Sequence, residues 1–134
     1  MADRRFTQFF YSFRKAPTYI EGNFVVGGTG AVGTVKGAGI ASVTRTGTGA
    51  YRITLEDAYN RYLSGTWGFV DAATVGIPTV KIITVIGNPN TTIRSKYIDI
   101  QCWGASGAAD PDANLVLGFT MIVDNTSVLP ANEL

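Results

Sequence analysis

An alternation of apolar and polar residues between positions 50 and 55 marks the clearest element of the chain. Tyr51, Ile53 and Leu55 share one parity, while the residues between them are polar. A period of two is typical of a strand with one buried face. We therefore expect these three side chains to face a hydrophobic core.

A second strand is expected directly before it, because residues 40–45 read Ile-Ala-Ser-Val-Thr-Arg. The two runs are joined by Thr-Gly-Thr-Gly at positions 46–49, a glycine-containing connection of hairpin length. The pattern predicts a β-hairpin over residues 39–55.

Further short runs rich in Val, Ile, Tyr and Phe are bounded by glycine and threonine, which predicts more strands. The run from Val80 to Ile86 is almost continuously apolar, as expected for a strand buried on both faces. These further strands are expected at residues 19–26, 31–36, 67–70, 79–86, 96–103 and 114–124.

Helical spacing occurs only between Leu55 and Leu63, where Tyr59 and Tyr62 complete one apolar face. Asparagine and tyrosine are poor helix formers, and Gly65 follows closely. This segment predicts a short helix or an irregular crossover.

Strands that do not alternate with long helices favour an all-β fold. Short strands at intervals of about 8–12 residues are typical of an antiparallel β-sandwich, jelly-roll or Greek-key like. We expect this sandwich to carry an extended N-terminal arm and at most one short helix. The 134 residues suit one domain, which we assign to residues 19–134, with the arm at residues 1–18.

The first fifteen residues differ from the rest because five aromatic side chains lie there between two pairs of basic ones. One interpretation is a first strand whose Phe9, Tyr11 and Phe13 join the core. The other is an arm that binds another subunit or another protein, since aromatic residues and arginine are enriched at interface cores. The candidate partner-binding residues of this arm are Arg4, Arg5, Phe6, Phe9, Phe10, Tyr11, Phe13, Arg14 and Lys15.

Composition narrows the functional classes. Eleven Lys and Arg balance ten Asp and Glu, so the net charge of +1 argues against nucleic acid as a partner. No apolar run approaches about 18 residues, so no membrane partner is expected. Histidine is absent and Cys102 is the single cysteine, which removes the usual nucleophile and base pairs. We therefore expect no enzymatic activity.

Residues 28–33 read Gly-Thr-Gly-Ala-Val-Gly and match the dinucleotide-binding pattern G-x-G-x-x-G. That pattern binds a cofactor only where its third glycine opens a helix. Here the next residues include Gly37 and Gly39 and show no helical spacing. Glycine-rich turns are the favoured interpretation, and no cofactor is expected.

Asp110, Asp112 and Asn114 imitate the start of a calcium-binding loop. Leu115 and Met121 occupy the positions where an EF-hand requires glycine and glutamate. The residues favour an exposed turn, no metal site is assigned, and a surface calcium site remains the alternative. Cys102 lies in an expected strand and is interpreted as a small buried hydrophobic residue.

Several segments taken together resemble small virion proteins of tailed bacteriophages. The first is Gly-Thr-Val-Lys-Gly-Ala-Gly-Ile-Ala-Ser-Val at residues 33–43, followed by the hairpin. The others are Asp-Ala-Tyr-Asn-Arg-Tyr-Leu at residues 57–63 and the apolar run at residues 117–128. The likeness covers about residues 19–128.

The resemblance implies a head decoration, or cement, protein on the outer surface of the capsid. Such a protein is a small β-sandwich, usually a homotrimer, that stabilises the virion by bridging neighbouring capsomers. Its partners are then further copies of itself and the major capsid protein, and the role requires no catalytic residue.

The alternative is a receptor- or glycan-binding head of a phage tail fibre or head fibre, because jelly rolls also serve lectins. It would need an exposed aromatic platform, for which Tyr59, Tyr62 and Trp67 are the one candidate cluster. Their apolar spacing favours burial in the core instead.

Overall fold

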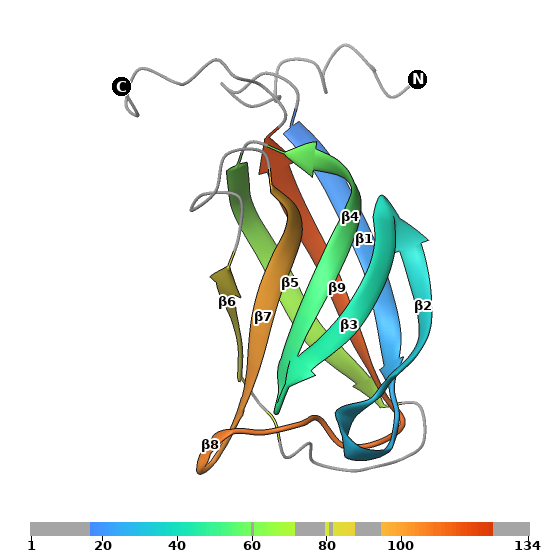
Figure 1. Ribbon diagram of the computed structural model, residues 1–134, viewed down its shortest axis with the longest axis vertical. Coiled ribbons are helices and arrows are strands. Elements are labelled where there is room, and N and C mark those ends of the chain that lie inside the picture. The colour runs from blue at the N-terminus through green and yellow to red at the C-terminus, as the bar shows by residue number, and fades with distance from the viewer. Residues whose placement is uncertain (1–16, 60, 72–79, 81, 88–94, 125–134) are drawn as a thin grey trace, which may run out of the picture.

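Two antiparallel sheets packed face to face form the protein in the computed structural model (Figure 1). The structure describes residues 17–59, 61–71, 80, 82–87 and 95–124. The prediction of an antiparallel β-sandwich is confirmed. The first strand begins at Pro17, two residues before the assigned start of the domain.

The first sheet has the strand order β2-β1-β9-β5, and the second has the order β3-β4-β7-β6, with β8 paired to β7. Neighbours such as β1 with β9 and β4 with β7 are far apart in sequence, a Greek-key kind of connectivity rather than a simple meander. The strands are β1 (Pro17–Val26), β2 (Val32–Ala38), β3 (Ile40–Gly47), β4 (Ala50–Tyr59), β5 (Arg61–Asp71), β6 (Ile82–Gly87), β7 (Ser95–Gly104), β8 (Gly107–Ala108) and β9 (Leu115–Asp124).

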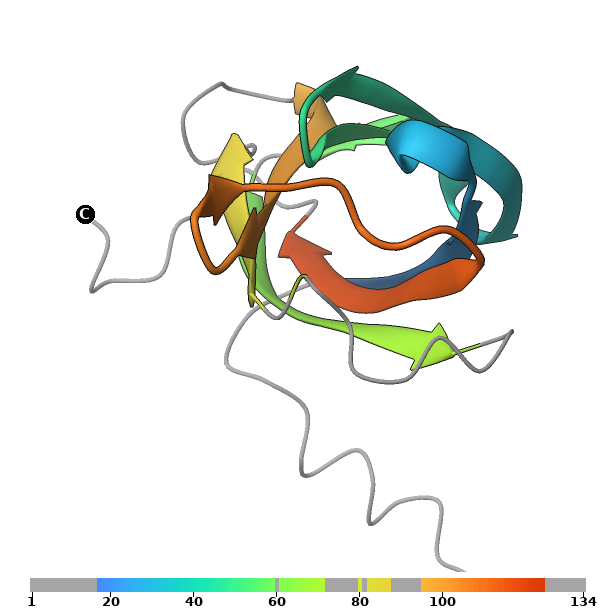
Figure 2. The same cartoon turned by 90° about the horizontal axis from the view of Figure 1, so that it is seen from below.

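The core lies between the sheets, as the view from below shows (Figure 2). The predicted inward face of β4 is confirmed, since Tyr51, Ile53 and Leu55 are at most 1% exposed. Every second residue of β9 is also buried, from Leu115 to Val123. Period-two burial on facing strands is what closes the core of a sandwich.

The predicted hairpin is confirmed as β3 and β4, which pair in antiparallel register. Thr48 and Gly49 connect the two strands, and Gly49 takes a φ of +68°. The Gly49 amide also donates a hydrogen bond to Asp110, at the lower end of the molecule.

The first sheet passes to the second at a corner between β2 and β3. Gly22 of β1 and Gly37 of β2 are register partners there. A Cβ atom on either glycine would collide with the side chain of Ile40, the first residue of β3. The absence of two side chains therefore lets Ile40 pack across the sheet where the chain changes layer.

The expectation of a short helix between Leu55 and Leu63 is wrong, whereas the alternative of an irregular crossover is confirmed, because β4 loses its register with β7 between Thr54 and Tyr59 and the chain then passes to β5 in the other sheet. β4 extends to Tyr59 and β5 begins at Arg61. Leu55 and Tyr59 are both buried, and a spacing of four residues keeps two side chains on one face of a strand as well as of a helix. The spacing alone therefore could not separate the two structures.

The expectation of a doubly buried strand at residues 79–86 is also wrong. Residue 80 is buried, but β6 is the last strand on the main path of its sheet. Ile82 and Ile86 are 60% and 56% exposed, while Ile83 and Val85 pack against the core. β6 therefore has one inner and one outer face, and residues 79 and 81 lie outside the described part.

Among the described residues the helical content is one three-residue 3-10 turn, η1 (Gly28–Gly30), which agrees with the expectation of at most one short helix. No helix in the described ranges is long and apolar enough to span a membrane.

Candidate interaction surface

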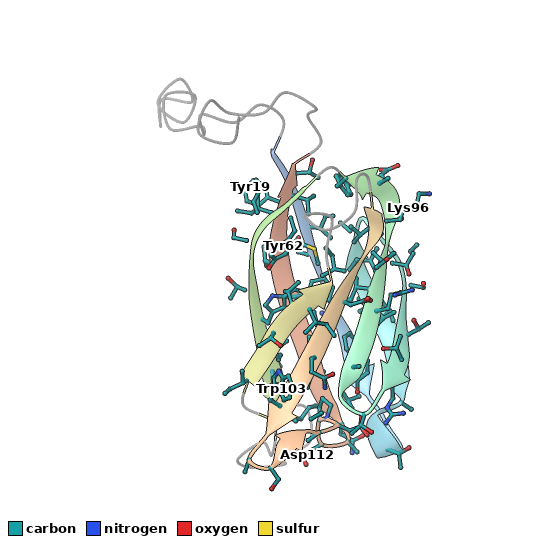
Figure 3. The ribbon with its side chains drawn as sticks, turned by 60° about the vertical axis from the view of Figure 1, so that its left-hand side comes forward. Tyr19, Tyr62, Lys96, Trp103 and Asp112 are labelled. Atoms are coloured by element: carbon teal, nitrogen blue, oxygen red, sulfur yellow. The ribbon has the colours of Figure 1, made fainter. Side chains whose placement is uncertain are left out.

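A strip of exposed apolar side chains lies on the outer face of the second sheet, at the β6 edge. Ile82 and Trp103 are register partners on β6 and β7, and Ile86 lies further along β6. Trp103 is 37% exposed, and its Nε1 donates a 2.8 Å hydrogen bond to Oγ1 of Thr84 (Figure 3). We call Ile82, Thr84, Ile86 and Trp103 the β6 strip.

The strip is notable because edge strands usually carry features that prevent contact with other chains. In the described part of the chain β6 pairs with β7 alone, so its other backbone edge has no strand beside it. Isolated exposed hydrophobic residues are ordinary on protein surfaces, whereas several on one edge indicate a contact surface.

The opposite face of β7, on the other side of the sheet from the strip, is buried in the core. Cys102 is fully buried opposite Ile83, which confirms its interpretation as a small hydrophobic residue. Burial raises the pKa of the Cys102 thiol to about 12, helped by the negative charge of Asp110. Because the thiolate is the reactive form, this thiol is inert in the folded protein.

A bidentate ion pair joins two adjacent strands on the outer face of the second sheet. The Arg52 guanidinium binds both carboxylate oxygens of Asp99, at 2.8 and 3.0 Å, from the adjacent strand. The same guanidinium lies 4.0 Å from the ring centre of Tyr97. The hydrogen bond with Asp99 raises the pKa of Arg52.

A second ion pair closes the lower end of the sandwich, where the segment between β8 and β9 passes beneath the sheets (Figures 1 and 2). Asp110 accepts hydrogen bonds from Nε and Nη2 of Arg45, at 2.9 and 2.7 Å. It also accepts one from the buried amide of Gly49 at 2.7 Å. Nearby, the Tyr51 hydroxyl donates a 2.7 Å bond to the carbonyl of Gly30.

The expectation that residues 110–114 form a merely exposed turn is wrong for its first half. Asp110 is partly buried and Pro111 is buried, because the segment packs against the hairpin. Asn114 has a φ of +70°, which is turn geometry. Both carboxylate oxygens of Asp110 bind the Arg45 guanidinium, and the described residues contain no group of three His, Cys, Asp or Glu side chains that could hold a metal ion.

The segment that matches the dinucleotide pattern has a different structure from a cofactor loop. η1 includes Thr29 with a φ of +56°, and the chain after it forms strand β2. A Cβ atom on Gly30 would collide with Asp110. The glycines therefore serve close packing at the lower end, as the interpretation of glycine-rich turns predicts.

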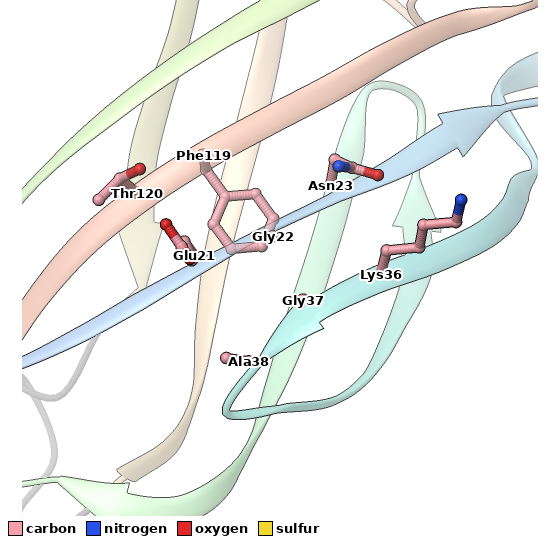
Figure 4. Close-up of a pocket in the computed structure, with 8 residues that line it drawn as sticks. All are labelled: Glu21, Gly22, Asn23, Lys36, Gly37, Ala38, Phe119 and Thr120. Carbon is pink, nitrogen blue, oxygen red and sulfur yellow. The ribbon is translucent and has the colours of Figure 1, made fainter.

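An open pocket of about 430 Å³ lies where β9, β1 and β2 adjoin (Figure 4). Glu21, Asn23, Lys36 and Thr120 supply its polar side chains. Phe119, Ala38 and the two glycines of the corner complete the lining, and the missing side chains of these glycines leave room for the hollow.

The three aromatic residues considered for a glycan platform belong to the core or pack against it. Tyr59 is 6% exposed, and Tyr62 and Trp67 pack against the core from β5. The Trp67 ring lies 5.1 Å from that of Phe119. Burial raises the pKa of both tyrosines. The core interpretation of this cluster is confirmed.

The candidate partner-binding residues of the arm, from Arg4 to Lys15, all lie outside the described residues. Sequence reasoning missed the strip itself, although the polar Lys81 and Thr84 within the apolar run were a signal for an edge strand.

Comparison of the chain with protein-family models, with curated proteins and with solved structures finds no match.

Proposed function

We propose that this protein is a structural virion protein of a tailed bacteriophage. It decorates the outer surface of the capsid and stabilises it by bridging neighbouring copies of the major capsid protein. It acts as a homotrimer, through surface contact and not through a chemical reaction. The resemblance of residues 19–128 to small virion proteins supports this role.

The observation that carries the proposal is the β6 strip. A decoration protein must bury part of its own surface against other chains, and a specific interface generally exceeds about 1,000 Å². Ile82 and Ile86 already expose more than half of their surface on a regular strand. Their burial on a partner supplies the apolar centre that such an interface needs.

The balance of charges also suits this role. The guanidinium groups of Arg52 and Arg45 are each paired with a carboxylate, and the chain as a whole carries a net charge of only +1. Neighbouring copies of a nearly neutral protein repel one another little when they pack closely on a shell.

Removal of residues 1–15 tests the proposal. We expect the truncated chain to bind phage heads that lack the protein at least tenfold more weakly than the full chain, because the arm supplies aromatic contacts. The melting temperature should change little, since the first described strand begins at Pro17 and the first buried core residue is Ile20. Head occupancy is measured by co-sedimentation across a range of protein concentrations.

A matched control keeps the full arm and replaces Thr7, Gln8 and Ser12 with alanine. These residues lie between the aromatic and basic ones, so head binding should stay within about twofold of the wild type. Equal binding by the truncated chain and the wild type would contradict the role of the arm. No binding of the full chain to heads would contradict the proposed function.

A further inference from the structure

The free edge of β6 has the requirements for accepting another strand. Its outer residues recur at every second position, at Ile82, Thr84 and Ile86. Its far backbone edge has no strand beside it among the described elements. A strand that joins this edge gains main-chain hydrogen bonds, and its own side chains lie next to those of β6.

The arm has a matching pattern. Phe9, Tyr11 and Phe13 recur at every second position, so in an extended conformation they share one face. Three aromatic side chains with this spacing can lie beside the three outer residues of β6, with one pair for each step along the strand. Aromatic residues beside β-branched ones are favourable cross-strand pairs.

We propose that the arm of one copy adds to β6 of a second copy as an antiparallel strand. Phe9, Tyr11 and Phe13 then cover the β6 strip and extend the second sheet of the neighbouring molecule. This inference deepens the self-association within the proposed function and rests on that part of it, but not on binding to the capsid.

The direction of the strands explains why the arm comes from a second copy. Pro17 lies at the upper end of the first sheet, and β6 runs upward from Ile82 (Figure 1). All strand pairs described in this fold are antiparallel. An antiparallel arm on β6 therefore runs downward and ends near Ile82.

The chain is too short to return from that point within one molecule. Four Cα steps separate Phe13 from Pro17, and they span at most about 14 Å. To join Pro17 of the same molecule, the chain would have to return from the Ile82 end of β6. That path covers about 20 Å along the six residues of β6 and about 10 Å between the two sheets. The arm reaches this position only when it belongs to a neighbouring copy.

This exchange also sets the symmetry of the assembly. The arm and the β6 edge are different surfaces, so each copy gives one contact and receives another. Contacts of this kind close into a ring when the rotation between copies permits. A ring of three copies agrees with the homotrimer in the proposed function.

Cross-linking between two different variants tests the exchange. One full-length variant carries Tyr11→Cys and the other carries Thr84→Cys, and the two are mixed and treated with a bis-maleimide that spans about 8 Å, the distance between diagonal neighbours in a sheet. Cys102 gives no background because its buried thiol has a raised pKa, of about 12. We expect a covalent dimer that contains one chain of each variant.

The matched control carries Thr44→Cys instead of Thr84→Cys. Thr44 is an exposed threonine on β3, the opposite edge strand of the same sheet, so we expect its cross-linked yield to be at least tenfold lower. Equal yields, or no product with Thr84→Cys, would overturn the proposal. A third variant carries both Tyr11→Cys and Thr84→Cys in one chain and is mixed with a large excess of unsubstituted protein, so that two substituted chains rarely meet. If a cross-link still formed within that single chain, it would also overturn the proposal.

The oligomeric mass gives a second measurement that does not need cysteine. Ile86→Asp should weaken self-association at least tenfold in sedimentation experiments, whereas Val70→Asp should not. Both residues are more than half exposed on strands, so neither change should prevent folding. A wild-type chain that is a monomer at high concentration, yet occupies phage heads, would overturn the arm exchange and leave the capsid role intact.

Discussion

Asp110 joins three segments at the lower end of the sandwich through its two carboxylate oxygens. It binds Arg45 of β3, the Gly49 amide of the hairpin turn, and lies against Gly30 of η1. The hydrogen bond from Arg45 and that from Gly49 lower the pKa of the Asp110 carboxyl, although partial burial opposes the shift. This one side chain therefore fixes how the β8–β9 segment packs on the hairpin.

Replacing Asp110 with alanine should reduce the free energy of unfolding by about 2 kcal/mol, because the buried Gly49 amide loses its acceptor. Asp110→Asn keeps an acceptor oxygen and should cost less. Urea denaturation measures both, and Asp57→Ala serves as the control because Asp57 is exposed on β4. Equal stability of Asp110→Ala and the control would contradict this role.

The lowered pKa predicts how the effect of Asp110→Asn depends on pH. A carboxyl whose pKa falls on folding stabilises the native state above its unfolded pKa of about 3.9. That stabilisation disappears as the pH falls through the lower folded value. The stability difference between wild type and Asp110→Asn should therefore shrink below about pH 4. A difference that grows in acid would contradict the ion pair.

At the scale of the element, the β3–β4 connection depends on one glycine. Gly49 has a φ of +68°, and a Cβ atom there would lie 2.8 Å from the Cys102 carbonyl oxygen. The hairpin turn is thus in contact with β7 as well as with the β8–β9 segment. This contact explains why Gly49 is buried although it lies in a turn.

Gly49→Ala should lower the free energy of unfolding by at least about 2 kcal/mol, since a positive φ and a close contact both oppose the added methyl group. Gly68→Ala is the matched control, because a Cβ atom on Gly68 of β5 meets nothing within 4 Å. Thermal unfolding of the two variants should separate them clearly. Similar melting temperatures would contradict the tight packing at Gly49.

The strands that could be predicted from the sequence are those whose alternation is unbroken. β9 alternates between buried and less buried residues throughout, and β4 does so as far as Leu55, so these inner faces follow from parity alone. β6 was misassigned because an apolar run is the same for a central strand and for an edge strand with exposed apolar side chains. The end of β4 was misassigned because a four-residue spacing fits two structures.

The lower-end contacts could not be predicted, because they join residues far apart in the chain. Arg45 and Asp110 are separated by 65 positions, and nothing in local sequence states that these two will meet. Asp110 was assigned to a turn from its neighbours, which was correct for Asn114 and incomplete for Asp110 itself. Local sequence patterns can predict strands. They cannot predict which charged residues form ion pairs, because that depends on how the strands pack.

At the scale of the whole molecule, folding buries the inner faces of the two sheets and leaves the β6 strip exposed. We propose that this strip and the basic, aromatic first residues of the chain are the surfaces used for binding. Arm exchange between copies and contact with a capsid are compatible, because the arm leaves most of the sandwich surface exposed to a shell.

The most direct test of this account is electron cryo-microscopy of phage heads incubated with the purified full-length protein. We predict added density on the outer surface of the capsid, in groups of three copies over the junctions between capsomers. Heads that show no added density, or protein found at a fibre tip, would contradict the proposal that this protein decorates and stabilises a capsid.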